Sequence, residues 1–294
     1  MTLVVGGATP EIGFLVADTL LTFEFQLKGH RGPVNGQFHA LKIQILKSNV
    51  AVAFAGDAAA SCWLIRELHA KITADPTVDP CSQLLASYNE LPASDSSDCD
   101  FLVLQLTPKG PKLAEVTRGG VLYYRRAYIG DDSEYKRMQG LRRPYATPSI
   151  QHVQQPDGTF RLTPLVLTEG ETEFAEVSNA MDALTHGRRR GSVGAIAGCV
   201  TRVVNARISG ELEYLQSVEV SLSPWEGASG FSVLSSNSGR RGVGIYYRSG
   251  KMGFLFVVGD DQPCHKEYAE TIEAFIGIAS AKYGLNMVGG TWDK

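Results

Sequence analysis

Residues 2–19 read TLVVGGATPEIGFLVADT, in which two apolar runs flank a short loop. The runs, Leu3–Gly6 and Gly13–Ala17, have the length and the β-branched content of strands. Gly7 and Pro10 between them favour a tight turn. This stretch therefore predicts an antiparallel hairpin at the start of the fold.

The same glycine-rich loop also resembles the phosphate-binding turn of a short-chain dehydrogenase. However, Glu11 occupies the middle glycine position of that fingerprint and would place a carboxylate where a phosphate binds. The interval between Gly13 and Gly56 is too short for the βα units of a dinucleotide-binding domain. Tyr247 and Lys251 have the spacing of that family's catalytic pair but fall in a predicted hairpin turn. The sequence therefore favours the hairpin over a nicotinamide site.

Beyond the hairpin, apolar periodicity alternates between strand and helix patterns. We expect further strands at 50–55, 99–106, 112–117, 121–129, 217–222, 230–235, 242–248 and 252–259. We expect helices at 58–72, 82–91, 171–185, 192–205 and 266–282. Prolines interrupt the pattern after Leu141, so residues 1–294 are expected to form a single domain with an insertion at about 141–170 and an extended C-terminal region, 236–294.

Composition excludes several classes of protein. The chain has 294 residues, 44% of them hydrophobic and 20% charged, and no apolar run of membrane-spanning length. A net charge of -3 offers little attraction to nucleic acid, and three consecutive arginines, 188–190, are too few for a phosphate track. The five cysteines show no paired spacing, and the N-terminus has no secretory pattern. We expect a cytoplasmic protein without a metal or cofactor, and neither a membrane nor a nucleic acid as its partner.

Thr2 follows a methionine that processing commonly removes before a small residue. A terminal threonine carries a hydroxyl nucleophile and, in its own α-amine of pKa about 8, a base for the hydroxyl proton. Most threonines at this position have no catalytic role. The spacing of the residues that follow is what makes Thr2 a candidate.

Three further residues lie in short motifs that follow Thr2: Asp18 in VADT, Lys42 in LKI and Gly56 in FAGD. With these motifs the chain resembles the proteasome β-subunit family, including the HslV-type bacterial peptidases. The resemblance covers about residues 2–142 and 190–235, with an insertion between Leu27 and Gln37 that displaces Lys42. It places Thr22 beside the substrate.

The resemblance implies a role for each residue. Lys42 would lower the pKa of the Thr2 amine, and Asp18 would hold Lys42 protonated and oriented. The backbone N–H of Gly56, at the start of a helix, would bind substrate and donate to the oxyanion.

Two looser matches depart from the family pattern. Asp131 in IGD stands where a serine normally supports the threonine. Glu226 in EGASG replaces an aspartate, whereas Ser229 in the same motif is retained. These departures leave the proton relay open.

The family implies an α+β fold, a four-layer αββα sandwich of two antiparallel sheets. It implies a threonine endopeptidase that hydrolyses peptide bonds of peptides or unfolded proteins through an acyl-enzyme on Thr2. Relatives form rings, so we expect a homo-oligomer; an ATPase or unfoldase partner is not identified. Two alternatives stay open: an amidohydrolase of the same superfamily that acts on small amides, and a ring or scaffold subunit without catalytic activity.

Overall fold

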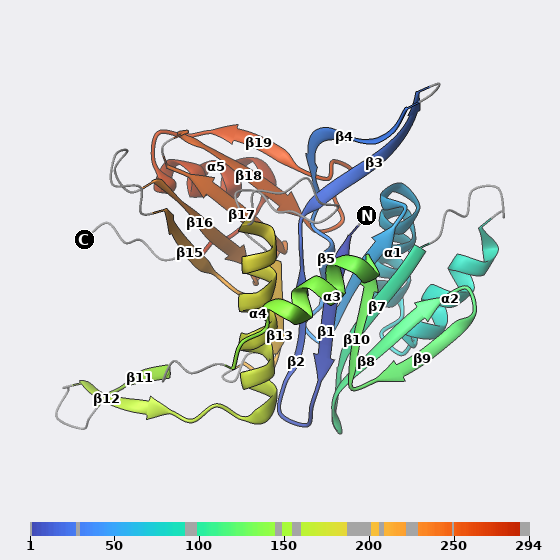
Figure 1. Cartoon of the computed structure of the whole chain (residues 1–294), viewed down its shortest axis with the longest axis horizontal. Coiled ribbons are helices and arrows are strands. Elements are labelled where there is room, and N and C mark those ends of the chain that lie inside the picture. The colour runs from blue at the N-terminus through green and yellow to red at the C-terminus, as the bar shows by residue number, and fades with distance from the viewer. Residues whose placement is uncertain are drawn as a thin grey trace.

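The computed structural model describes residues 2–27, 30–91, 99–144, 149–154, 160–186, 201–205, 209–221, 229–248 and 250–288. Within 21–38, 149–165 and 217–231 it describes the backbone alone. This part of the chain is an α+β fold with five helices, three five-stranded antiparallel sheets and two separate strand pairs (Figure 1). In these ranges, no helix has both the length and the apolar character that crossing a membrane requires.

The first sheet carries the N-terminal hairpin and has the order β10-β1-β2-β13-β14. Its strands are β1 (Leu3–Ala8), β2 (Gly13–Ala17), β10 (Arg126–Gly130), β13 (Thr201–Asn205) and β14 (Leu212–Tyr214). The predicted hairpin is confirmed, with Val4 opposite Ala17. Gly7 lies inside β1 and not in the turn. A Cβ at this position would come within 2.5 Å of the Phe14 ring. The glycine makes room for that ring.

The second sheet faces the first and has the order β5-β6-β7-β8-β9. Its strands are β5 (Ile43–Lys47), β6 (Val50–Gly56), β7 (Cys99–Thr107), β8 (Gly110–Thr117) and β9 (Gly120–Tyr124). Contacts between the two sheets involve β1, β2 and β10 on one side and β6, β7 and β8 on the other. Val4 and Leu15 belong to the apolar core that joins the sheets, whereas Leu3 and Phe14, which alternate with them, face away. This alternation assigns the two faces of the hairpin.

Helices cover the outer faces of both sheets. Helix α1 (Ala58–Ala74) contacts β6, and α2 (Pro80–Glu90) contacts β8 and β9. Helix α4 (Glu169–His186) contacts β1 and β2, and α3 (Asp132–Leu141) packs on α4. Asp57 begins α1 by accepting hydrogen bonds from the N–H groups of Ala59 and Ala60 at 2.8 and 2.9 Å. The helix start is thereby fixed directly after Gly56.

The third sheet contains the C-terminal strands in the order β15-β16-β17-β18-β19. They are β15 (Ser217–Ser221), β16 (Ser229–Ser236), β17 (Gly242–Tyr247), β18 (Met252–Val257) and β19 (His265–Tyr268). Helix α5 (Ile272–Tyr283) packs on β17, β18 and β19. Val243 and Phe256 belong to the main core, so this sheet is joined to the rest of the molecule through buried side chains.

Two strand pairs project from this body in Figure 1: β3 (Leu20–Leu27) with β4 (His30–His39), and β11 (Ser149–Gln154) with β12 (Phe160–Leu165). The first pair contains the sequence insertion before Lys42. The second falls within the predicted insertion at about 141–170, and residues 155–159 between its strands lie outside the described residues.

Three predicted elements are wrong in part. The strand expected at 121–129 is two strands, because the chain leaves the second sheet at Arg125 and enters the first as β10. Thr201–Asn205, expected to end a helix, is strand β13, since its β-branched side chains fit beside β2; the remainder of that helix, 192–200, lies outside the described residues. The helix expected at 266–282 begins at Ile272, capped by Thr271, and His265–Tyr268 extends the third sheet instead.

Candidate functional site

Thr2 is buried, with 4% of its surface exposed, at the start of the interior strand β1. Its carbonyl oxygen accepts a hydrogen bond from the N–H of Asp131 at 2.8 Å. The neighbouring Gly130 has φ +102°, and a Cβ there would overlap the Thr2 carbonyl oxygen. The end of β10 must therefore be glycine for Thr2 to occupy this place.

Asp18 is fully buried and binds the backbone directly after Thr2. Its Oδ1 accepts from the N–H of Leu3 at 3.1 Å, and its Oδ2 accepts from the N–H of Leu20 at 3.3 Å. The Asp18 N–H donates to the carbonyl of Leu3 at 3.4 Å. One carboxylate thus ties the end of the first hairpin to the position of Thr2.

Lys42 completes a buried ion pair with Asp18. Its Nζ lies 2.8 Å from Asp18 Oδ1, and both side chains have 0% exposure. The ammonium also donates to the carbonyl of Leu20 at 2.5 Å. Burial lowers the pKa of Lys42 below its usual value, and the Asp18 carboxylate opposes that shift. The carboxylate of this buried pair is bonded to the backbone of Leu3, one residue after Thr2.

Gly56 is brought to the same region by β6. It is the last residue of that strand, has φ +93° and precedes the α1 cap, Asp57. The preceding residue, Ala55, lies near Gly130, because a Cβ on that glycine would be 3.5 Å from the Ala55 side chain. The end of β6, just before α1, therefore lies near the end of β10, where Gly130 contacts the Thr2 carbonyl.

Asp131 contacts Thr2 through its backbone. Its carboxylate caps α3: Oδ1 accepts from the N–H groups of Ser133 and Glu134 at 2.9 and 3.1 Å and from the Ser133 hydroxyl at 2.6 Å. The residue thus has a structural role that its place in the sequence motif did not suggest. Its part in a proton relay stays a prediction.

The other predicted site residues are Thr22, Ser229 and Glu226. Thr22 lies in β3, where the backbone alone is described. Ser229 is the first residue of β16, in the third sheet and not in the sheet that holds Thr2. Glu226 lies outside the described residues. The structure therefore places Thr2, Asp18, Lys42, Gly56 and Asp131 at the ends of strands in the first two sheets, whereas Ser229 belongs to the third sheet.

Sequence reasoning missed His39. Its Nδ1 lies 3.1 Å from the hydroxyl of the buried Thr19, directly after Asp18. Burial, with the nearby Lys42 charge as the second cause, lowers the pKa of His39 to about 4. The imidazole is therefore neutral at neutral pH. Its position three residues before Lys42 was the one signal in the sequence, and it belongs to no motif.

A cavity of about 360 Å³ adjoins this group of residues. One wall contains Ala40 and Gln44, which flank Lys42, together with Ala58 and Ala59 at the start of α1. The wall thus contains sequence neighbours of Lys42 and Gly56, while the Asp18 and Lys42 side chains themselves have no exposed surface. Among the described residues, no group of three or more His, Cys, Asp and Glu side chains is arranged to hold a metal ion.

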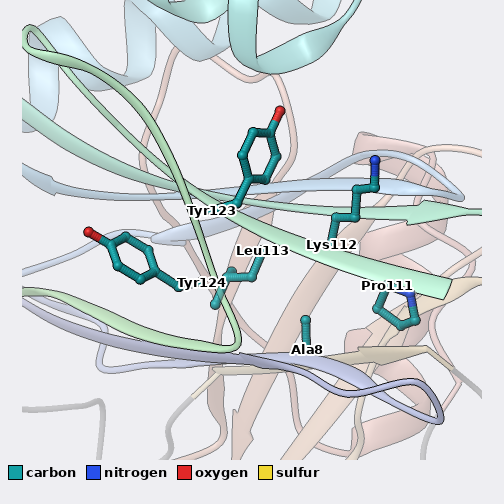
Figure 2. Close-up of a pocket in the computed structure, with 6 residues that line it drawn as sticks. All are labelled: Ala8, Pro111, Lys112, Leu113, Tyr123 and Tyr124. Carbon is teal, nitrogen blue, oxygen red and sulfur yellow. The ribbon is translucent and has the colours of Figure 1, made fainter. Parts of the chain in front are cut away.

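A second hollow of about 310 Å³ lies at the opposite end of β1, where it is bordered by Ala8. Figure 2 shows Tyr123 and Tyr124 diverging from β9, with Lys112 directed to the same side as Tyr123. Because Ala8 is the last residue of β1 and Thr2 precedes the first, this hollow is separate from the candidate site.

Comparison of the chain with models of known protein families and with curated proteins finds no match. The arrangement of Thr2, Asp18 and Lys42 is therefore interpreted from its own geometry and chemistry.

Proposed function

We propose that the first two sheets and their helices form the four-layer αββα sandwich of an N-terminal nucleophile hydrolase, and that Thr2 is its nucleophile. The observation that carries the proposal is the buried Asp18–Lys42 pair, hydrogen-bonded to the backbone of Leu3 next to Thr2. A buried ion pair contributes little net stability compared with apolar residues of the same size. A pair placed beside a candidate nucleophile is better explained by chemistry at that nucleophile.

The proposed reaction begins once the chain is cleaved before Thr2, which leaves a free α-amine. That amine takes the proton of the Thr2 hydroxyl, directly or through a water, while Oγ attacks the carbonyl carbon of the substrate amide. The Lys42 charge favours the neutral amine and so keeps it able to accept a proton. The Gly56 N–H donates to the oxyanion.

The second half of the reaction returns the proton. The tetrahedral intermediate collapses by breaking the C–N bond, and the leaving amine takes the proton held by the Thr2 ammonium. This leaves an ester between the acyl group and Thr2 Oγ. Water, deprotonated by the same amine, then hydrolyses the ester and restores the hydroxyl.

The substrate class proposed is a peptide or an unfolded protein, and the activity that of a threonine endopeptidase. A homo-oligomeric ring in the cytoplasm would enclose such a site, as in the family that the sequence resembles. The Asp131 carboxylate favours a second candidate, a scaffold subunit without activity or an amidohydrolase for small amides, because it caps α3 where the family has a serine that supports the threonine.

Intact-mass measurement of the purified chain tests the proposal. We expect a chain that starts at Thr2 and gains one equivalent of a peptide epoxyketone, because this reagent needs both the hydroxyl and the free amine of one residue. Thr2→Ala should form no adduct, and Thr2→Ser, which keeps both groups, should form it. A chain that keeps Met1, or Thr2→Ala with undiminished peptide hydrolysis, would refute the mechanism.

A further inference from the structure

The cavity beside the candidate site is built from two parts of the chain that are far apart in sequence. Cys62 and Trp63 of α1 line it on one side. The opposite wall is the loop Gly259–Pro263, which connects β18 to β19 of the third sheet. The third sheet therefore supplies part of the wall of a cavity that also contains the sequence neighbours of Lys42 and Gly56.

Charged residues at this cavity are paired with one another. Arg66 of α1 forms an ion pair with Asp261 of the loop. Asp260 lies 3.1 Å from Arg240, and its Oδ1 also accepts from the N–H of Gln262 at 3.1 Å. Each carboxylate of the loop thus has a guanidinium beside it. A charged group that entered the cavity would meet no unpaired partner among these four side chains.

Apolar side chains make up the wall nearest the site. Ala40, Ala58 and Ala59 are small and leave the space open, and Trp63 adds an aromatic side chain with 41% exposure. The volume of about 360 Å³ is at the lower end of the roughly 300–1,000 Å³ typical of small-molecule pockets. The cavity suits one side chain of a substrate rather than a whole folded partner.

We propose that the loop Gly259–Pro263 is a specificity-determining wall of the proposed hydrolase. It would select substrates in which the residue on the acyl side of the cleaved amide has an uncharged, largely apolar side chain. The Arg66–Asp261 pair keeps the wall electrically balanced, and this balance excludes acidic and basic side chains alike. The inference rests on the proposed function, and its charge component can be measured without catalysis.

Breaking the pair from either side should give opposite preferences. Asp261→Asn leaves the Arg66 guanidinium unpaired at the cavity and should favour anions. Arg66→Gln leaves Asp261 unpaired and should favour cations. Because both side chains are exposed, solvent screening limits each effect to about threefold at low ionic strength, and it should fall as salt is raised.

Cys62 provides the readout that is independent of catalysis, because its thiol lines the cavity. We would measure its modification by a sulfonate and by a trimethylammonium methanethiosulfonate, and quantify the Cys62 adduct by peptide mass mapping. Burial raises the pKa of this thiol to about 11, which slows both reagents equally and cancels in their ratio. The anion-to-cation ratio should rise about threefold in Asp261→Asn and fall about threefold in Arg66→Gln.

The second arm measures hydrolysis of peptides with Leu, Glu or Lys before the cleaved bond. The parent chain should prefer Leu, Asp261→Asn should gain activity on Glu, and Arg66→Gln on Lys. Lys251→Gln and Glu270→Gln break an exposed ion pair elsewhere on the third sheet and are the matched controls. They should change neither readout.

Each outcome decides the inference. Opposite shifts in both arms support it. Labelling ratios that stay unchanged in both variants overturn it, as does a parent preference for a charged side chain. Shifted labelling without hydrolysis of any peptide refutes the proposed function and, with it, the substrate class, while the charge balance of the cavity stands.

Discussion

Asp18→Asn is the most direct test of the ion pair beneath Thr2. In the parent chain Asp18 Oδ1 accepts from Leu3 and Lys42, and Oδ2 accepts from the N–H of Leu20. Asparagine keeps one oxygen but places an NH₂ group against a backbone donor, and it leaves the Lys42 ammonium buried without a counter-charge. Removing one partner of a buried pair costs about 3–5 kcal/mol, so the free energy of unfolding near neutral pH should fall by about that amount.

The loss should depend on pH in a defined direction. Burial already lowers the pKa of Lys42 from its ordinary value of 10.5, and Asp18 is the group that raises it. Without Asp18 that pKa falls further, so between it and 10.5 the unfolded chain binds more protons than the folded one. Stability of the variant therefore rises with pH across this window. The double variant with Lys42→Met has no ammonium to titrate and should lack this rise.

Urea denaturation of the parent, both single variants and the double variant, near pH 7 and near pH 9.5, measures these differences. The double variant should be more stable than the sum of the two single losses predicts, because it removes both charges together. A loss of less than about 1 kcal/mol in Asp18→Asn, or one that does not change with pH, would show that the pair is not buried as described.

Substitutions at three further positions test other parts of the site. Gly130→Ala should lower the melting temperature and the yield of folded protein, because its Cβ would overlap the Thr2 carbonyl at φ +102°; unchanged thermal unfolding would contradict this packing. His39→Gln should flatten the dependence of stability on acid pH. In the parent, the unfolded chain binds more protons than the folded chain between pH 6.5 and about 4, so the free energy of unfolding falls as the pH falls through that range, by up to about 1.4 kcal/mol per pH unit. Equal slopes in parent and variant would argue against this role of His39. Asp131→Ala should lower the free energy of unfolding in urea by about 1 kcal/mol because it removes the α3 cap, whereas Asp131→Asn should keep the cap. Loss of hydrolysis in Asp131→Asn without loss of stability would assign the carboxylate to the relay. Equal stability losses in both variants would refute the capping role.

Local patterns identified the elements that carry their own signals. The hairpin around Gly13–Ala17, strand β6 and helix α1 were predicted nearly to their ends, because their continuous or helically spaced apolar residues act within a few positions. A change of the neighbouring strand or sheet leaves no such local pattern in the sequence. Residues 121–129 remain extended on both sides of Arg125, so periodicity alone could not show that the chain changes sheets there. Thr201–Asn205 became a strand through pairing with β2, which is a tertiary effect.

Some features of the candidate site could likewise be predicted from the sequence, and others could not. The family resemblance implied that Asp18 and Lys42 belong to one site, and the structure pairs their side chains beside the backbone of Leu3. The resemblance could not anticipate that the Asp131 carboxylate caps a helix or that His39 lies against Thr19. Those contacts depend on side-chain directions at element ends. The catalytic roles themselves stay predictions until the chain is tested.

The burial of Thr2 at the start of an interior strand has a practical consequence for anyone who prepares the protein. β1 has a neighbour on each side, and Thr2, directly ahead of it, is buried and bonded through its carbonyl to the N–H of Asp131 after β10. An affinity tag fused there would have to leave this buried position through the opening by which, under the proposed function, a substrate reaches Thr2. Purification handles therefore belong at the other end of the chain, beyond α5, where they leave this opening clear.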